Sequence, residues 1–323
     1  MNKIICFMYD IGHKFGMGHL NRCLAINQKL LKKKISTYYL NSNNYDTNII
    51  KKQNHKIIHK KDLIKFVGLN NILIVDSYNI NQRKINELAR YFKYIFLIND
   101  IPNKNLSVYG LLNSNYKIKK KDFNEQKIRK FFLGINYKFI RKVKIPFVKN
   151  RKGITISFGG GNVYFRTKNY ILSVLKFLNN INFDEKIIIY MNLNYQQKKE
   201  ILKFKNLNIK ICNISNNFIK MAYKSKFVIS SLGMQHDELY KLKIPSIFLK
   251  IAKNQEQNYK FALKINPEFT HDLKKINKKT VVNTLSKILI KKKRFGIIKN
   301  YNSFQLGKKT NFFINHLKYL FYN

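Results

Sequence analysis

Short apolar runs alternate with segments of helical periodicity along most of the chain. The runs expected to form strands cover residues 4–8, 35–40, 72–75, 94–98, 153–158, 186–191, 207–212, 227–230 and 245–249. Helices are expected at 20–31, 80–92, 166–179, 194–204, 215–224, 234–243, 254–265 and, last, 303–321. This alternation predicts an α/β chain with parallel sheets, right-handed crossovers and ligand sites at the carboxyl ends of the strands.

The chain is expected to contain two domains, because 323 residues exceed what one small core usually organises. Residues 141–152 are highly charged, contain Pro146 and lack periodicity, so they are the expected linker. We therefore predict two doubly wound, Rossmann-type domains at 1–145 and 150–302. A C-terminal helix within 303–323 is expected to pack back onto them.

A glycine-rich turn links the first expected strand to the first expected helix. Gly16 and Gly18 let the backbone turn sharply and leave room for a ligand. The helix begins near His19, so free backbone N–H groups and the positive end of the helix dipole face the turn beside an imidazole. This pattern predicts an anionic ligand next to a proton-transfer group.

The common nucleotide-binding motifs do not fit this turn. Asn21 stands where a dinucleotide fingerprint needs its third glycine, and the second expected strand ends in Asn41-Ser42-Asn43-Asn44 instead of an acid for the ribose. No Gly-Lys-Ser/Thr follows, so a Walker loop is also absent from the sequence. Binding of NAD or ATP through this turn is therefore not expected.

Polar residues follow several expected strands, at the positions where α/β folds place their chemistry. They are Asp76-Ser77-Tyr78, Asn99-Asp100 and Asn113 in the first half, and Gly159-Gly160-Gly161-Asn162, Ser230-Ser231-Leu232-Gly233 and Lys253-Asn254-Gln255 in the second. A glycine run before a helix is typical of a phosphate-binding nest, but it is also a common tight connection. Taken alone, Asp76 or Asp100 is more often a helix N-cap than a catalyst, and Glu238 a surface residue. The prediction depends on their combination.

The net charge of +47 is interpreted as a solvated, lysine-rich surface and not as a nucleic-acid interface. Only eight of the 63 basic residues are arginine, the residue that reads bases and binds phosphate bidentately. The lysines are scattered over the whole chain. Attraction to an anionic substrate or to an anionic membrane face stays open.

The sequence has no apolar run approaching the ~20 residues that span a bilayer, and its N-terminus does not fit a signal peptide. Cys6, Cys23 and Cys212 are odd in number and widely spaced, which fits neither a disulfide framework nor a metal cluster. We therefore expect a cytoplasmic protein with no metal and no stable membrane insertion, for which peripheral membrane contact is left open.

Taken in chain order, the motifs resemble the UDP-sugar hydrolases of pseudaminic acid biosynthesis, which are grouped with spore-coat polysaccharide proteins. The matching residues are Asp10 with Gly16-Met-Gly-His-Leu-Asn-Arg22, Asp76-Ser-Tyr78, Asn99-Asp100, Leu111-Leu-Asn113, Gly134 to Arg141, Phe158-Gly-Gly160, Glu238 before Pro245, and Asn254-Gln255. Most departures lie in the nucleotide half: Gly161-Asn162 replace Ser/Thr-Asp, Phe165 replaces an Asn, and Gln235 replaces a small hydroxyl residue. In the first half, Asn99 replaces one Asp of a pair.

The resemblance implies a GT-B-like fold with two Rossmann-type domains and a cleft between them. It implies hydrolysis of UDP-2,4-diacetamido-2,4,6-trideoxy-β-L-altropyranose to UDP and free sugar, with water as the acceptor, no cofactor and His19 as the catalytic residue. The residues implied for substrate binding are Asp10, Gly16, Gly18, Arg22, Asp76, Tyr78, Arg141, Asn254 and Gln255. Those implied for nucleotide binding by the C-terminal domain are Gly159, Gly160, Gly161, Asn162, Gly233 and Glu238. A monomer is expected from the analogy of fold.

Two other functions fit the same residues. A glycosyltransferase for surface polysaccharide would use a nucleotide-sugar in the same way, with a sugar or lipid acceptor in place of water. A non-catalytic module would bind a sugar nucleotide or a nucleic acid without turnover.

Overall fold

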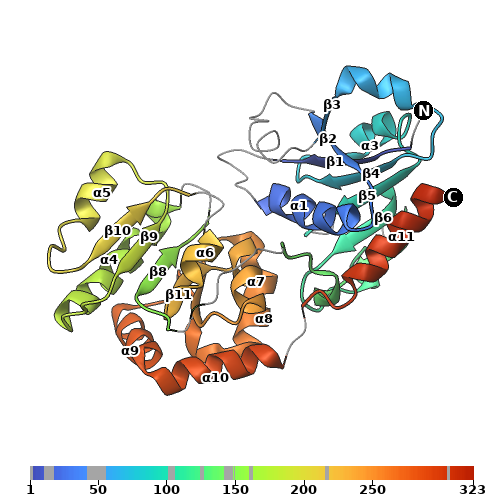
Figure 1. The fold of residues 1–323 in the computed structure, drawn as a ribbon. Helices are drawn as coiled ribbons and strands as arrows, with labels where there is room; N and C mark the ends of the chain where they lie inside the picture. The colour runs from blue at the N-terminus through green and yellow to red at the C-terminus, as the bar shows by residue number, and fades with distance from the viewer. Residues whose placement is uncertain are drawn as a thin grey trace. The chain divides into compact units, whose positions relative to one another are not determined.

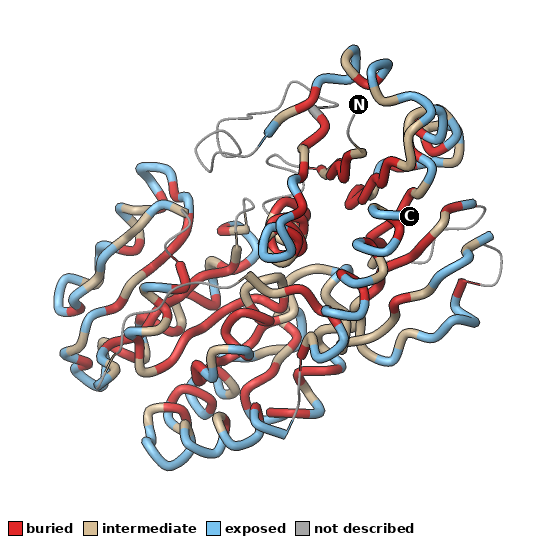
Figure 2. The backbone as a smooth tube through the Cα atoms, turned by 45° about the vertical axis from the view of Figure 1, so that its right-hand side comes forward, coloured by how far each residue is buried: buried red, intermediate tan, exposed pale blue. Residues whose placement is uncertain are grey.

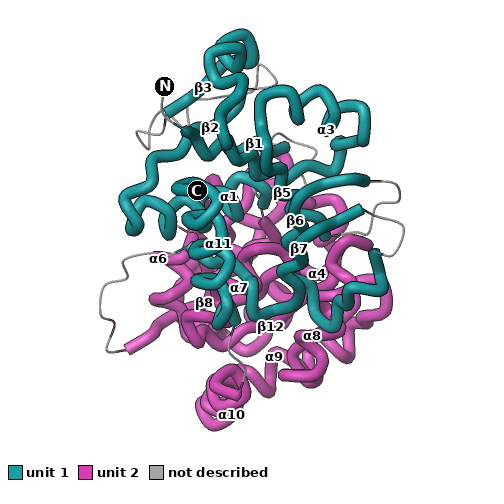
Figure 3. The backbone as a smooth tube through the Cα atoms, turned by 90° about the vertical axis from the view of Figure 1, so that its right-hand side faces the viewer, with its two compact units in different colours: residues 1–142, 305–323 teal, residues 143–304 magenta. Residues whose placement is uncertain are grey.

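The computed structural model describes residues 3–10, 18–41, 56–100, 106–123, 127–141, 148, 150–159, 163–214, 218–303 and 306–323. The chain forms two compact units (Figure 3): unit 1 comprises Met1–Lys142 and Gln305–Asn323, and unit 2 comprises Val143–Phe304. The last segment of the chain therefore belongs to the same unit as its beginning. Much of the expected linker at 141–152 lies outside the described residues.

Unit 1 is built on a parallel sheet that has seven strands in the described residues, in the order β3-β2-β1-β4-β5-β6-β7 (Figure 1). The strands are β1 (Ile5–Tyr9), β2 (Thr37–Asn41), β3 (Lys56–His59), β4 (Ile72–Asp76), β5 (Tyr94–Ile98), β6 (Ser107–Asn113) and β7 (Lys127–Leu133). The helices are α1 (Gly18–Leu31), α3 (Gln82–Leu88) and α11 (Thr310–Tyr322), with short 3-10 turns η1 (Lys60–Phe66), η2 (Lys120–Phe123) and η3 (Ile135–Tyr137).

Both faces of this sheet are apolar, because parallel strands are covered on each side. Ile5 and Phe7 of β1 point into a core that they share with α1 and α11. Cys6 and Met8 point to the other face, into the core that contains the buried side of α3. Figure 2 shows the continuous buried stretches that result along the strands. The chemistry of unit 1 is therefore confined to the ends of its strands.

Helix α11 is anchored to unit 1 by aromatic packing. Phe313 is fully buried, and its ring meets those of Phe96, Phe132 and Phe139 edge-on at centroid distances of 5.6, 4.8 and 5.6 Å. The approach to the helix is fixed by the backbone N–H of Gly307, which donates to the carbonyl oxygen of Ile135 in η3.

Unit 2 is a second parallel sheet, with six strands in its described residues, in the order β10-β9-β8-β11-β12-β13. The strands are β8 (Ile154–Ser157), β9 (Ile187–Tyr190), β10 (Ile209–Cys212), β11 (Phe227–Ser231), β12 (Ser246–Lys250) and β13 (Thr270–Asp272). The helices are α4 (Tyr164–Asn180), α5 (Tyr195–Ile201), α6 (Phe218–Ala222), α7 (Met234–Lys241), α8 (Glu256–Ile265), α9 (Lys278–Leu289) and α10 (Lys291–Asn302), with 3-10 turns η4 (Lys253–Gln255) and η5 (Pro267–Phe269).

These two sheets confirm the predicted doubly wound architecture. In unit 1 the strand order reverses between β1 and β4, and in unit 2 it reverses between β8 and β11. Open α/β sheets bind ligands outside the carboxyl ends of the strands at such reversal points. The residues after β1 and β4, and those after β8 and β11, are therefore where a site is expected.

One titratable residue of unit 2 gives a pH prediction. Half-buried His271 in β13 lies 3.0 Å through Nε2 from Thr284 Oγ1 of α9, and burial lowers its pKa below the ordinary 6.5. Near and below pH 6.5 the unfolded chain therefore binds more protons at this histidine than the folded chain does. His271 leaves the free energy of unfolding unchanged above about pH 6.5 and lowers it as the pH drops below that value. Urea unfolding of His271→Gln at pH 7.5, 6.5 and 5.5 should show a weaker pH dependence than the wild type. Equal dependence would contradict this, and His59→Gln, at an exposed histidine of β3, is the matched control.

Candidate active site

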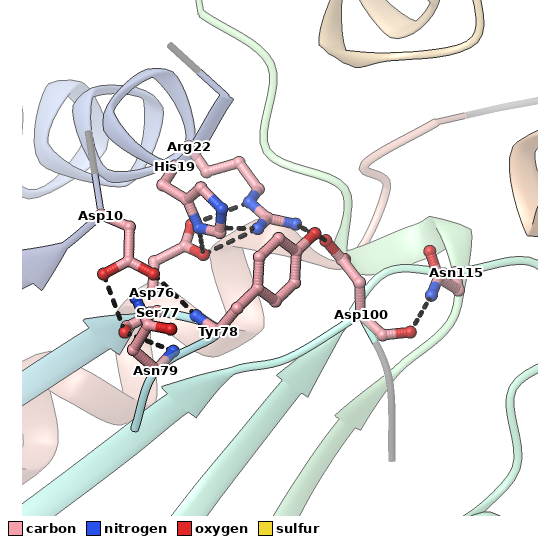
Figure 4. A network of polar contacts seen from close by, with 9 residues as sticks. All are labelled: Asp10, His19, Arg22, Asp76, Ser77, Tyr78, Asn79, Asp100 and Asn115. Carbon is pink, nitrogen blue, oxygen red and sulfur yellow. Dashed lines mark hydrogen bonds and ion pairs between the residues drawn. The ribbon is translucent and has the colours of Figure 1, made fainter. Parts of the chain in front are cut away.

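A buried histidine and carboxylate meet at the reversal point of unit 1 (Figure 4). His19 is the second residue of α1, and its Nδ1 lies 2.5 Å from Oδ1 of Asp76, the last residue of β4. His19 is 3% exposed and Asp76 is 0% exposed. Because a carboxylate only accepts hydrogen bonds, we assign a proton to Nδ1, which in the neutral imidazole leaves the lone pair on Nε2. The Tyr78 ring packs edge-on against the imidazole, with 4.6 Å between the ring centroids, and limits the rotation of the imidazole.

Arg22, one helical turn after His19, binds the same carboxylate and a second one. Its Nε donates to Oδ2 of Asp76 at 2.8 Å, and one terminal nitrogen donates to Oδ1 at 2.7 Å. The other terminal nitrogen donates to Oδ2 of Asp100 at 2.5 Å. Burial alone would lower the pKa of Arg22, but Asp100 and Asp76 outweigh it and raise that pKa well above its ordinary value. Burial alone would raise the pKa of Asp100, and the Arg22 guanidinium holds it below its ordinary value.

Asp10 fixes the loop that carries Tyr78. From the carboxyl end of β1, its Oδ1 accepts from the Ser77 hydroxyl at 2.9 Å and its Oδ2 accepts from the backbone N–H of Tyr78 at 2.8 Å. The Tyr78 hydroxyl in turn donates to Oδ2 of Asp100 at 3.2 Å. Asn115 donates through Nδ2 to the backbone carbonyl of Asp100 at 2.7 Å. The ends of β1, β4 and β5 are thus joined in one network with the first turns of α1 (Figure 4).

The sequence analysis left several members of this network out of the expected site, and two of them lie beyond the Asp10–Tyr78 loop contacts. Asp100 and Asn115 were left out of the expected site, although Asp100 follows β5 just as Asp76 ends β4. Adjacent parallel strands bring their carboxyl ends together. The expectation that β4 and β5 pair could therefore have placed Asp100 beside Asp76.

The reversal point of unit 2 carries a network of neutral polar groups. Gln235 in the first turn of α7 turns inward, where its Nε2 donates to Ser157 Oγ at 3.0 Å and its Oε1 accepts from Ser230 Oγ at 3.2 Å. Gly233 caps α7 without a side chain, and Gly159 has φ +96, a conformation that favours glycine. Glu238 is buried in the same helix.

The expected site residues are distributed over the two units. Asp10, His19, Arg22, Asp76 and Tyr78 form the network of unit 1, and Gly18 begins the helix that carries it. Arg141 is half-buried in unit 1, and the contacts described above for that network do not include it. Gly159, Gly233, Glu238, Asn254 and Gln255 lie in unit 2, where Asn254 is exposed and Gln255 accepts from the backbone N–H of Ile251 at 2.8 Å. Gly16, Gly160, Gly161 and Asn162 lie outside the described residues.

The described part of the chain holds no group of three or more His, Cys, Asp or Glu side chains arranged to bind a metal ion. Among the same residues, no helix is both long enough and apolar enough to cross a membrane. The three cysteines are free, and burial raises the pKa of the Cys23 thiol in α1 well above its ordinary value.

Known structures of similar fold align over nearly the whole chain. MurG from Acinetobacter baumannii aligns with 98% of this chain and 99% of its own, at a TM-score of 0.57 and 11% identity. UGT89C1 from Arabidopsis thaliana, solved with UDP, aligns over 98% of both chains at a TM-score of 0.66 and 9% identity. The fold is GT-B. A putative UDP-N-acetylglucosamine 2-epimerase from Listeria monocytogenes aligns with 96% of this chain and 94% of its own, at a TM-score of 0.53 and 11% identity.

Sequence comparison adds little to this likeness. No protein-family model matches the chain. "Protein Ycf2" from Physcomitrium patens is 26% identical over 263 residues, which is 78% of this chain, and the chain spans 10% of that protein. The GT-B fold implied by the motifs is therefore confirmed by structure, and the particular hydrolase family stays a prediction.

Proposed function

We propose that the chain is an enzyme that cleaves a nucleotide-sugar at its anomeric carbon with water as the acceptor. The observation that carries the proposal is the buried His19–Asp76 pair at the reversal point between β1 and β4. Arg22 donates to both oxygens of the Asp76 carboxylate, so the group that holds the imidazole is itself fixed and the ring is held in one orientation. A general base needs this fixed geometry, because proton transfer depends on the position of the accepting nitrogen.

The proposed reaction depends on which imidazole nitrogen carries a proton and which one can accept a proton. Nε2 of His19 takes a proton from water while the water oxygen bonds to the anomeric carbon. The bond from that carbon to the diphosphate oxygen breaks, and UDP leaves with the bonding electrons. Nδ1 keeps its hydrogen bond to Asp76, whose charge stabilises the imidazolium that forms.

The remaining expected site residues are proposed to bind the substrate. We propose that Tyr78 and Arg141 contact the sugar, and that Asp10 acts by holding the Tyr78 loop through the bonds described above. In unit 2 we propose that the nucleotide diphosphate is bound by residues 159–162 and by backbone N–H groups at the start of α7, beside Gly233. The φ of Gly159 and the glycine cap of α7 support this, because neither glycine places a side chain beside the neighbouring backbone amides. Glu238 is proposed for the ribose, and Asn254 with Gln255 for the sugar or diphosphate.

The substrate proposed from the motif resemblance is UDP-2,4-diacetamido-2,4,6-trideoxy-β-L-altropyranose. The test is to incubate the purified protein with this substrate, without any acceptor, and to follow the anomeric ³¹P and ¹H signals by NMR. Appearance of UDP and free sugar is the expected result. An unchanged substrate, with UDP still perturbing the protein spectrum, would overturn hydrolysis of this sugar.

A glycosyltransferase is the second candidate, favoured by the likeness in fold to UGT89C1. The same base would deprotonate an acceptor hydroxyl instead of water. Turnover that begins only when a sugar or lipid acceptor is added, with a new glycoside as product, would support the transferase and exclude the hydrolase.

A further inference from the structure

The outer face of α11 carries exposed aromatic rings in unit 1. Phe312, Tyr319 and Tyr322 are 65%, 62% and 58% exposed. Spacings of seven and three residues place them on one side of the helix, while Phe313, Leu317 and Leu320 on the opposite side are buried in the core. We call Phe312, Tyr319 and Tyr322 the α11 aromatic face. Exposed rings grouped in this way are typical of an interaction surface, whereas single exposed apolar residues are ordinary.

The surroundings of this face are strongly basic. The described C-terminal residues of unit 1, 306–323, contain three lysines and no Asp or Glu. Lys308 and Lys309 are exposed at the start of α11, and exposed Lys318 places its Nζ 5.8 Å from the centre of the Tyr322 ring. Lys29 of α1 reaches the same helix and donates to Oδ1 of Asn311 at 2.8 Å.

The ion pairs described in unit 1 do not involve Lys308, Lys309 or Lys318. Asp62 and Glu87 pair with lysines of η1 and α3, and Asp76 and Asp100 pair with Arg22. The α11 aromatic face is thus framed by cations, which fits an anionic partner.

We infer that the α11 aromatic face is a peripheral docking surface for a bilayer of anionic lipids. Aromatic rings on an amphipathic helix insert at the level of the headgroups, and lysines beside them are attracted to anionic lipid at about 1 kcal/mol each. A second copy of the chain fits poorly, because it would bring two sets of lysines together. Proteins that stack single-stranded nucleic acid line a groove with their rings, whereas these rings are exposed on one side of a single helix.

The chain contains no tryptophan, so one introduced tryptophan is a unique probe of this surface. The Tyr319→Trp variant of the full-length protein should show a blue-shifted emission with phosphatidylglycerol vesicles and quenching by brominated phosphatidylglycerol. Tyr195→Trp is the matched control, since Tyr195 is 80% exposed on α5 in unit 2. The emission of this control should stay unchanged. An unshifted emission from the Tyr319→Trp variant, or an equal shift in both variants, would overturn the inference.

Vesicle co-sedimentation separates the rings from general charge attraction. Replacing all three rings (Phe312→Ser, Tyr319→Ser, Tyr322→Ser) should lower binding at least about tenfold, since burying only ~60 Å² of apolar surface supplies that factor. Lys318→Ser should lower it about fivefold. Unchanged binding in the triple variant, with a wild-type circular dichroism spectrum, would overturn the inference. So would tighter binding to poly(U) than to the vesicles, or dimerisation that the triple variant abolishes. These variants touch no residue of the proposed active site, so the outcome is independent of the proposed function.

Discussion

Replacing His19 with Ala is expected to reduce turnover of the nucleotide-sugar by about 10²–10⁴-fold, which is the usual contribution of a positioned general base. The loss arises because no other described nitrogen of the network can serve: the Arg22 guanidinium stays protonated and is bonded to Asp76 and Asp100. UDP should still bind, since His19 is proposed to act on water and not on the nucleotide. Turnover is measured by ³¹P NMR, and UDP binding by saturation-transfer NMR.

His59→Asn is the matched control, because His59 is an exposed histidine of β3 in the same unit. It should retain full activity. His19→Asn should behave as His19→Ala, since an amide can replace the hydrogen bond to Asp76 and still cannot accept a proton from water. Full activity in either His19 variant would remove this residue from the mechanism, whichever acceptor the enzyme uses.

The fold was predictable where the hydrophobic pattern is simple. The buried runs at 72–75 and 94–98 became β4 and β5 because central parallel strands are apolar on both faces. The expected strands passed from 94–98 directly to 153–158, yet β6 and β7 lie between them. In β7, at the edge of the sheet, Lys127, Arg129 and Lys130 interrupt the apolar pattern, because only part of an edge strand is buried.

The candidate site was predictable in its parts and not in its connections. Spacing indicated that His19 and Arg22 lie one helical turn apart, and the strand pattern placed Asp76 and Asp100 at the ends of their strands. The sequence did not say that all three guanidinium nitrogens of Arg22 would donate to these two carboxylates, because that depends on the distance between β4 and β5. The resemblance implied substrate binding by Arg22, which stays a prediction, and its contacts in addition make it a residue that positions Asp76.

Replacing Arg22 with Met should therefore lower the free energy of unfolding of unit 1 by about 3–5 kcal/mol at pH 7, the usual cost of removing one partner of a buried ion pair. The side chains of Arg22, Asp76 and Asp100 are only 13%, 0% and 18% exposed, so solvent cannot replace the lost guanidinium. Urea unfolding measures the loss, and Arg90→Met, at an exposed arginine of the same unit, is the matched control.

The pH dependence distinguishes lost charge pairing from lost packing. Arg22 holds the pKa of Asp100 below its ordinary value, so this contribution to stability is present above about pH 3.8 and is lost as the pH falls through the folded pKa. The difference in the free energy of unfolding between the wild type and Arg22→Met should therefore become smaller below pH 4. The double variant Arg22→Met/Asp100→Asn should recover part of the stability at pH 7, because one of the two orphaned carboxylates is then gone. A difference that stays constant with pH, together with no recovery in the double variant, would mean that Arg22 stabilises unit 1 by packing alone.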